Sequence, residues 1–369
     1  MGHPDCTMEG MDVNTAFWRG KRVLVTGHTG FKGSWLALWL RGAGAEVHGY
    51  SLPPPTQTNL FTEARVADAL AGHTLGDLSD FAALQDAVKK AAPDIVFHLA
   101  AQSLVRESYR QPVQSYATNV MGTVHLLEAV RTCPGVRALV SVTTDKVYEN
   151  REWAWAYREN EPLGGLDPYA SSKACAELVT AAYRASFLAQ DGVAVATARA
   201  GNVIGGGDWA VDRLVPDFFR ATDATLPLEV RHAGATRPWQ HVLEPLGGYL
   251  LLAERLAGGD PAFAQAWNFG PTDNDAVPVR TLLDALVRKL PESRWHETPD
   301  HRVHEANFLK LDSSKARTAL GWQPRWNLDT ALDKTVEWHR AWRAGTNVQQ
   351  VCEAQIQAYQ DAAHGPLRH

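Results

Sequence analysis

Three glycines with the spacing GxxGxxG lie near the start of the chain, between a short apolar run and an apolar helical stretch. The run 22–26 is typical of a buried parallel strand, and 32–42 has the broad apolar face of a helix. Gly27, Gly30 and Gly33 between them permit a tight turn and let backbone N–H groups approach a pyrophosphate, which a helix N-terminus also attracts. The pattern therefore predicts a dinucleotide-binding unit, although a tight turn without a ligand can have the same spacing.

Apolar strands and amphipathic helices alternate along the first 200 residues. Further strands are expected at 46–50, 94–99, 137–142 and 193–198, and further helices at 81–92, 113–131 and 168–189. This alternation predicts an α/β fold, a Rossmann-type doubly wound parallel sheet with right-handed crossovers. After about residue 202 the pattern weakens, and helices are expected at 243–256, 280–290, 313–320 and 328–343.

These patterns divide the chain into three parts. We expect a flexible N-terminal extension over 1–17, a Rossmann domain over 18–201, and a smaller α+β substrate-binding region over 202–369 that is interleaved with the Rossmann domain.

Charge and cysteine content exclude several kinds of protein. The net charge of -5 at pH 7 gives no sign of a nucleic-acid-binding surface, and no apolar stretch approaches the ~20 residues that span a membrane. The four cysteines lie far apart, so neither a metal site nor a disulfide framework is expected. No signal-peptide pattern precedes the fold. A cytoplasmic protein fits these features best.

The choice of cofactor depends on the end of the second strand, near Ser51. Dinucleotide sites often hold the ribose there with a carboxylate about 20 residues after the glycines. Ser51 can contact a ribose, but the carboxylate is missing and no arginine is present for a 2′-phosphate, so the sequence favours NAD over NADP. Asp77 and Leu78 can reach the adenine, although an aspartate in a loop serves equally often as a turn or helix cap.

Tyr169 and Lys173 are four residues apart at the start of an expected helix, so they share one helix face. A lysine ammonium beside a phenol stabilises the phenolate and lowers the pKa of the tyrosine. Such a pair can remove a hydroxyl proton while hydride moves to a nicotinamide. An ordinary surface pair has the same spacing, but the glycine loop about 140 residues earlier favours the catalytic interpretation.

With these features the chain resembles the extended short-chain dehydrogenase/reductase family. The resemblance rests on the three glycines, the segment 98–101, Asn119, Tyr169 and Lys173. It implies that Asn119 shapes the active-site helix. It also implies cofactor contacts from Thr29, Phe31, Lys32, Leu99, Ala100, Ala101, Gln102, Thr118 and Thr143, besides Tyr169 and Lys173.

The segment 142–148, with Thr144, Asp145 and Lys146, resembles the sugar-nucleotide 4,6-dehydratases more narrowly. After oxidation at C4, the C6 hydroxyl must leave, and a carboxylic acid in the position of Asp145 can protonate this poor leaving group. Thr144 can bind the C4 oxygen or the developing enolate. Lys146 replaces the glutamate base of commoner relatives. It either takes the C5 proton as a neutral amine, orients a water or stabilises the enolate.

Five further stretches, 145–150, 157–165, 200–209, 212–217 and 237–241, resemble the dehydratases that act on CDP-D-glucose. This implies a lyase with bound NAD that makes CDP-4-keto-6-deoxy-D-glucose for 3,6-dideoxyhexoses of surface polysaccharide. It also implies a homodimer or tetramer through the helices that begin near 113 and 169. The implied substrate contacts are Gln102, Asn202, Arg213, Leu214, Arg237 and His304, although either arginine alone suits a structural ion pair nearly as well.

Two other functions agree with the same motifs. A dehydratase or epimerase for another nucleotide sugar, UDP-sugars first, would keep the cofactor residues and change the substrate contacts. A non-catalytic NAD-binding regulator would need neither Asp145 nor Tyr169. The presence of Thr144, Asp145, Tyr169 and Lys173 together argues against the regulator.

Overall fold

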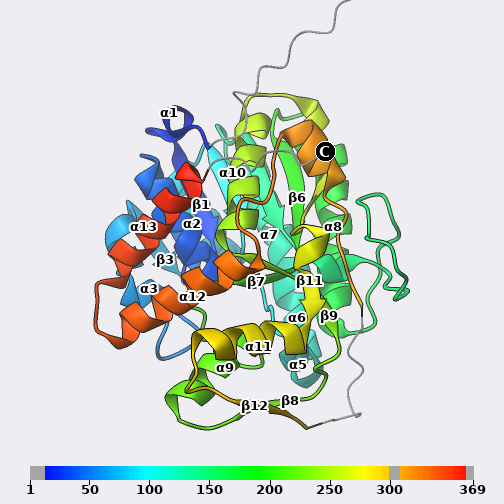
Figure 1. Ribbon diagram of the computed structural model, residues 1–369. Coiled ribbons are helices and arrows are strands. Elements are labelled where there is room, and N and C mark those ends of the chain that lie inside the picture. Colours follow the sequence, from blue (N-terminus) through cyan, green and yellow to red (C-terminus); the bar gives the residue numbers. More distant parts are fainter. Residues whose placement is uncertain (1–12, 299–307, 363–369) are drawn as a thin grey trace, which may run out of the picture.

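The computed structural model describes residues 13–298 and 308–362 and contains one seven-stranded parallel sheet with the strand order β10-β6-β5-β4-β1-β2-β3 (Figure 1). Its strands are β1 Arg22–Thr26, β2 Glu46–Ser51, β3 Gly72–Leu75, β4 Ile95–His98, β5 Ala138–Val142, β6 Ala194–Ala200 and β10 Ala266–Phe269. The predicted Rossmann-type sheet is confirmed. The chain builds outward from β1 first in one direction and then in the other, so the strand order reverses between β1 and β4, where ligands of such sheets bind.

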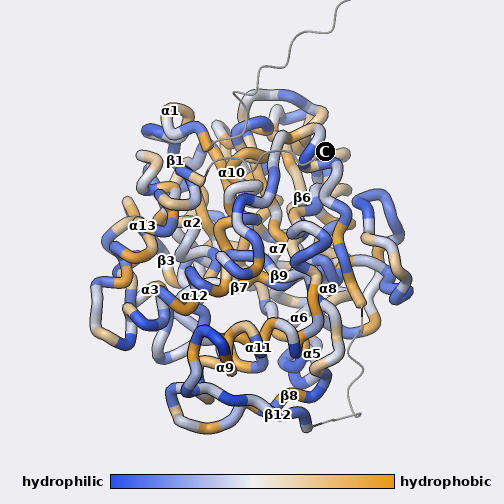
Figure 2. Tube along the Cα trace, viewed as in Figure 1, coloured by the Kyte–Doolittle hydropathy of each residue, from blue (hydrophilic) through white to orange (hydrophobic). Residues whose placement is uncertain are grey.

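Helices cover both faces of this sheet because alternate strand residues point to opposite sides. Val23 and Val25 pack with α2 and α10 in one core cluster, whereas Leu24 packs with α4 and α7 in another. The helices against the sheet are α2 Phe31–Gly42, α4 Phe81–Ala91, α7 Gly122–Arg131, α8 Pro168–Tyr183 and α10 Leu243–Ala257, while α6 Pro112–Tyr116 packs on α8 and α13 Val348–Asp361 packs on α2 and on α12 Leu328–Arg343. Figure 2 shows hydrophobic residues concentrated along the central strands and α10, and hydrophilic ones in the outer loops.

A smaller α+β region lies beyond the carboxyl ends of the sheet strands. It contains a three-stranded sheet, β11-β9-β7, and a two-stranded sheet, β12-β8. Its elements are β7 Asn202–Ile204, α9 Leu214–Asp223, β8 Leu228–Val230, β9 Thr236–His241, β11 Ala276–Pro278, α11 Val279–Lys289, β12 Trp295–Glu297 and α12 Leu328–Arg343. The residues after 202 also supply β10, α10 and α13 to the main sheet and its cover, so the two regions are interleaved (Figure 1).

The N-terminal segment differs from the expectation of a flexible extension over 1–17. Residues 1–12 lie outside the described residues. Helix α1 (Thr15–Trp18) is capped at its N-terminus by Asn14, whose side chain accepts the Ala16 N–H at 3.0 Å. The indole of Trp18 is fully buried and donates to Glu254 Oε1 at 2.6 Å. A buried tryptophan joined to α10 fixes this segment, so the ordered fold begins before Trp18.

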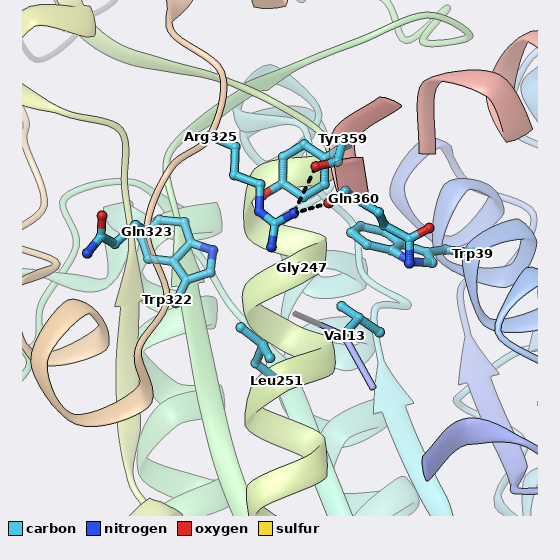
Figure 3. Close-up of a pocket in the computed structure, with 9 residues that line it drawn as sticks. All are labelled: Val13, Trp39, Gly247, Leu251, Trp322, Gln323, Arg325, Tyr359 and Gln360. Carbon is cyan, nitrogen blue, oxygen red and sulfur yellow. Dashed lines mark hydrogen bonds between the residues drawn. The ribbon is translucent and has the colours of Figure 1, made fainter. Parts of the chain in front are cut away.

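A buried carboxylate anchors the C-terminal helix α13 to the fold. Glu244 on α10 accepts the Tyr359 hydroxyl at 2.9 Å and the Trp326 N–H at 2.7 Å. Figure 3 shows the guanidinium of Arg325 donating to the carbonyl oxygens of Tyr359 (2.9 Å) and Gln360 (2.8 Å). The small cavity beside them has a volume of about 20 Å³, which suits one water molecule and no larger ligand.

Among the described residues, no helix is both long and apolar enough to cross a membrane.

Candidate active site

A cleft of about 1280 Å³ opens between the carboxyl ends of the sheet strands and the smaller region. This volume exceeds the ~300–1,000 Å³ of an ordinary small-molecule pocket, so the cleft has room for a dinucleotide and a second ligand. The predicted site residues that line it are Gly27, Thr29, Gly30, Phe31, Lys32, Gly33, Ser51, Asp77, Leu78, Leu99, Ala100, Ala101, Gln102, Thr118, Thr143, Lys146, Tyr169, Lys173, Asn202, Arg213, Leu214 and Arg237. Residues from 27 to 237 therefore meet in one place.

The glycine loop has the shape that a pyrophosphate site needs. Gly27 has φ +78°, and a Cβ there would lie 2.6 Å from the Ala100 nitrogen. A Cβ on Gly33 would lie 2.1 Å from the Gly27 oxygen, so glycine is required for α2 to pack on the loop. Within the described part of the chain, no side chain caps the first turn of α2. Its backbone N–H groups thus remain for an anion, and the loop fits a dinucleotide.

The end of β2 provides hydroxyl groups where many such sites have a carboxylate. Thr29 Oγ1 lies 2.8 Å from Ser51 Oγ and donates to the Leu52 oxygen at 2.8 Å. Asp77 lines the cleft, and its carboxylate also accepts the Ser79 N–H at 2.8 Å. Asp77 can therefore cap the turn and still be placed to contact the adenine, as proposed.

Asn119 joins three segments around the cleft, from a π-helical turn (Ala117–Met121) that the sequence did not predict. Its amide nitrogen donates to the Gln102 oxygen and to Ser172 Oγ, both at 2.9 Å. Its amide oxygen accepts the Gln102 N–H at 2.9 Å. These bonds hold the loop after β4 against α8, which carries Tyr169.

The environment of Tyr169 differs from the simple pair expected with Lys173. Lys173 Nζ donates to the Val142 oxygen at 3.1 Å, and burial lowers the pKa of Lys173 to about 8. Burial raises the pKa of Tyr169, while Lys146 and a hydrogen bond with Thr144 oppose that rise. Lys146 therefore also favours the Tyr169 phenolate, beside the predicted partner Lys173, and both lysines line the cleft with Tyr169.

Thr144, Asp145 and Lys146 form a compact cluster at the end of β5, where the short helix η3 (Asp145–Val147) begins. Asp145 Oδ1 accepts the Thr144 hydroxyl at 3.0 Å and lies 3.4 Å from Lys146 Nζ. Asp145 is 1% exposed, and its Oδ2 has no hydrogen-bond partner among the described residues. Thr144 and Asp145 do not line the cleft itself. They lie between Thr143 and Lys146, which do line it, and Asp145 Oδ2 would be 3.0 Å from a Cβ on Gly201, another residue of the lining.

A buried ion pair beneath this cluster was not predicted from the sequence. Glu177 on α8 accepts Thr143 Oγ1 at 2.5 Å and Thr197 Oγ1 at 2.6 Å. It also accepts Arg199 Nε at 2.8 Å, and Arg199 donates onward to the Tyr148 hydroxyl at 2.8 Å. The network joins α8 to the end of β5 and to β6, next to the predicted catalytic residue Thr144. Tyr169, Lys173 and Glu177 are each four residues apart, so they lie on one face of the helix. This spacing could have identified Glu177 from the sequence.

Replacing Glu177 with Gln should lower the free energy of unfolding by about 3–5 kcal/mol, because Arg199 would keep its buried charge without a counter-charge. Glu128→Gln is the matched control, since Glu128 forms its ion pair with Arg131 at the surface and should cost about 0–1 kcal/mol. Urea unfolding of both variants measures the difference. Equal losses would contradict a dominant role for the buried pair.

The two predicted substrate arginines both line the cleft. Arg213, at the start of α9, donates to Asp208 Oδ2 and to Ser103 Oγ, each at 2.9 Å, and Asp208 raises its pKa. Arg213 thus forms an ion pair and also lines the cleft, and its predicted substrate contact stays a prediction. Arg237 on β9 lines the cleft and donates to the Thr236 oxygen at 3.0 Å. His304 lies outside the described residues.

Comparisons with known proteins agree with this site. A family model described as GDP-mannose 4,6 dehydratase matches residues 24–335. A CDP-glucose 4,6-dehydratase of Salmonella typhimurium is 50% identical over 95% of this chain and 99% of its own length. A dTDP-glucose 4,6-dehydratase of Streptomyces griseus is 31% identical over 87% of this chain and 95% of its own length. Among solved structures, MoeE5 in complex with UDP-glucose and NAD has a TM-score of 0.73 and 26% identity, covering 87% of this chain and 99% of that chain.

A Rossmann-type sheet with a glycine-rich loop and a Tyr–Lys pair in one cleft defines a short-chain dehydrogenase/reductase of the extended type. Within that class, the chain belongs to the GDP-mannose 4,6-dehydratase family of sugar-nucleotide dehydratases.

Proposed function

We propose that the chain is an NAD-dependent hydro-lyase that converts CDP-D-glucose to CDP-4-keto-6-deoxy-D-glucose and water. The observation that carries this is the cluster of Thr144, Asp145 and Lys146 against Tyr169, because elimination needs an acid besides the oxidising pair. The 50% identity to a CDP-glucose 4,6-dehydratase over nearly the whole chain supports the same activity and the CDP-sugar substrate.

The glycine loop, Ser51 and the residues after β4 fit NAD as described above. NAD held there would supply the hydride acceptor for oxidation at C4 of the sugar and the hydride donor for C6. Thr143 and Lys173 lie at the end of β5 and on α8, and both line the same cleft as Tyr169. The glycine loop lines this cleft too, so the sugar and the cofactor share one space.

The protein residues handle the protons. Tyr169 takes the proton of the C4 hydroxyl, and Thr144 hydrogen-bonds the C4 oxygen. Lys146 removes the C5 proton and returns it to C5 later. Asp145 gives its proton to the C6 hydroxyl, which leaves as water. Lys146 faces both Asp145 and Tyr169, so one amine can balance charge on either group during the reaction.

The diphosphate of the substrate needs cations, and Arg213 and Arg237 are those we assign to it. A guanidinium binds phosphate oxygens in pairs, and both side chains line the cleft. Asn202, Leu214 and Gln102 line the same cleft and are the further substrate contacts we assign. His304 is kept as a proposed ribose contact.

A mass-spectrometric substrate screen tests this function. The purified protein with NAD should convert CDP-glucose to a product lighter by one water and leave UDP-glucose largely unchanged. Conversion of UDP-glucose but not CDP-glucose would replace the proposed substrate with another nucleotide sugar. Bound NAD with every sugar unchanged would favour a non-catalytic regulator.

We also propose that the protein is a homodimer, or a dimer of such dimers, through α6, α7 and α8. Large apolar side chains are exposed on these neighbouring helices and the π-helical turns that continue them: Val113 (83%), Met121 (48%), Leu178 (60%) and Phe187 (46%). Exposed apolar residues gathered on adjacent helices mark an interaction surface. Leu178→Glu should therefore shift the mass measured by light scattering to that of one chain, whereas Leu226→Glu, at an equally exposed leucine elsewhere, should not.

We place this enzyme in the cytoplasm, where its product would feed 3,6-dideoxyhexose synthesis for lipopolysaccharide or another surface polysaccharide. The described cysteines Cys133, Cys175 and Cys352 are free thiols, which agrees with a reducing compartment.

A further inference from the structure

Arg213 is held at both ends of its guanidinium by residues from two different segments of the chain. Its Nη1 donates to Asp208 Oδ2 and its Nη2 donates to Ser103 Oγ, each at 2.9 Å. Asp208 lies five residues earlier, in the loop before α9, whereas Ser103 follows β4 and is 110 residues away in sequence. All three residues line the cleft. Because each terminal nitrogen has its own acceptor, the guanidinium is fixed in direction as well as in place.

Asp208 is itself placed rigidly enough to orient another side chain. Its side chain is 6% exposed. Its Oδ1 accepts the Ala210 N–H at 3.0 Å, while Oδ2 accepts Arg213. The loop around it is tied to α9 by Arg220, which donates to the carbonyl oxygens of Trp209 (3.0 Å) and Ala210 (3.3 Å). A rotation of the carboxylate would therefore break two hydrogen bonds at once.

Ser103 belongs to a loop that is equally well ordered. The side chain of Gln102, just before it, donates through Nε2 to Ser115 Oγ at 2.9 Å and accepts the Leu104 N–H through Oε1 at 2.6 Å. The Gln102 N–H donates to Asn119 Oδ1 at 2.9 Å. Both acceptors of the Arg213 guanidinium are thus fixed by the fold itself.

An arginine in this setting differs from one whose side chain moves freely. Asp208 and Ser103 use two of the five guanidinium N–H donors of Arg213, which leaves three for a ligand. A mobile arginine has many rotamers and loses that freedom when it binds. The two bonds have already removed this freedom from Arg213. They also carry a disadvantage, because the Asp208 carboxylate offsets part of the charge that attracts a diphosphate.

We propose that Asp208 and Ser103 are positioning residues, which aim the guanidinium of Arg213 at the diphosphate of the substrate. This role rests on the proposed function, in which Arg213 binds that diphosphate. Both residues act through Arg213 rather than on the reacting atoms, and the orientation that Asp208 gives outweighs its partial neutralisation of the charge. The diphosphate takes no part in the chemical steps, so positioning should act on substrate affinity and leave kcat unchanged.

A double-mutant cycle tests whether Asp208 and Ser103 act through Arg213. Asp208→Ala, Ser103→Ala and Ser103→Thr are each made in the wild type and in Arg213→Ala. The dissociation constant of CDP is measured by calorimetry with NAD present, and UDP is measured in parallel. KM and kcat for CDP-glucose and the melting temperature are recorded for each variant. Asp223→Ala is the matched control, because Asp223 forms its ion pair with Arg343 outside the cleft.

We expect Asp208→Ala to raise the dissociation constant of CDP by about 10-fold and Ser103→Ala by about 3-fold, because each removes a hydrogen bond to a charged group. KM for CDP-glucose should rise by the same factors while kcat stays within about twofold of the wild type. Ser103→Thr keeps the hydroxyl and should bind like the wild type, as should Asp223→Ala. In Arg213→Ala, neither alanine substitution should weaken CDP binding further.

Three results would overturn the proposal. Tighter CDP binding by Asp208→Ala would show that the carboxylate acts as a counter-charge that opposes the diphosphate. An equal loss of CDP binding with and without Arg213 would make Asp208 a structural residue of the cleft. Unchanged CDP binding in both Asp208→Ala and Ser103→Ala would leave Arg213 without any need of positioning. If Asp208→Ala does not fold, the pair Ser103→Ala and Ser103→Thr carries the test.

Failure of the proposed function has a different signature, because it shows in the wild type. A wild type that binds UDP and not CDP would change the proposed substrate, and the same cycle with UDP would then decide the positioning role. A wild type that binds neither nucleotide would reject the proposed function and, with it, the diphosphate contact of Arg213.

Discussion

Tyr169→Phe is expected to lower kcat by about 10³-fold while KM and the bound cofactor change little. The substitution removes the group that accepts the C4 proton, and a positioned acid or base contributes about 10²–10⁴-fold to a rate. The ring stays, so packing of this buried side chain on α8 is preserved. Lys146 and Thr144, which favour the phenolate in the wild type, then have no oxygen to stabilise. Absorbance of reduced nicotinamide after mixing with CDP-glucose measures C4 oxidation directly.

Tyr183→Phe is the matched control, because it makes the same change at the other end of α8, where Tyr183 packs against Phe187 away from the cleft. It should leave kcat within about twofold of the wild type, as expected for a surface change. A Tyr169→Phe variant that retains more than a tenth of wild-type turnover would show that another group accepts the C4 proton.

Local sequence patterns were sufficient for the Rossmann half and for most of the cleft. Gly27 and Gly33 had to be glycine because backbone comes within 3 Å of where their Cβ atoms would be, and such positions are visible in the sequence as a spaced motif. Parallel strands end at one edge of a sheet, so residues that follow separate strands, such as Ala100 and Thr143, were predictably neighbours. The YxxxK spacing then placed Tyr169 beside them.

Contacts between distant segments were not predictable in the same way. Glu177 binds Thr143, Thr197 and Arg199 from two different strands, and nothing in their spacing of 20 to 34 residues marks them as partners. The burial of Asp145 likewise follows from the turn after β5 and from Gly201, rather than from its own motif. The electrostatic surroundings of the site residues therefore differ most from the sequence predictions. An example is Lys146, which favours the phenolate form of Tyr169 from a separate segment of the chain.

Two elements in the C-terminal half, helix α13 and strand β10, were not predicted from the sequence. Helix α13 buries Val348, Cys352, Ile356 and Tyr359, whose spacing of three and four residues is that of an amphipathic helix. Strand β10 is four residues long and pairs with β6 across 65 residues of intervening chain, so its place in the main sheet depends on tertiary packing. The prolines and glycines between 205 and 238 suggested that the chain after them forms a region separate from the Rossmann domain. Both elements were therefore not expected to pack with the main sheet.

Asp145→Asn is expected to retain C4 oxidation and to lose overall turnover by about 10³-fold. An amide has nearly the same shape as the carboxyl and can still accept the Thr144 hydroxyl, so the cluster should keep its geometry. It has no acidic proton to give to the C6 hydroxyl, and hydroxide does not leave readily without one. Reduced nicotinamide should therefore accumulate with CDP-glucose, while mass spectrometry detects no product lighter by one water.

The accumulation separates Asp145→Asn from Tyr169→Phe, which should not form reduced nicotinamide at all. Asp191→Asn, at a surface loop outside the cleft, is the matched control and should turn over like the wild type. Full turnover by Asp145→Asn would remove Asp145 as the acid that protonates the C6 hydroxyl.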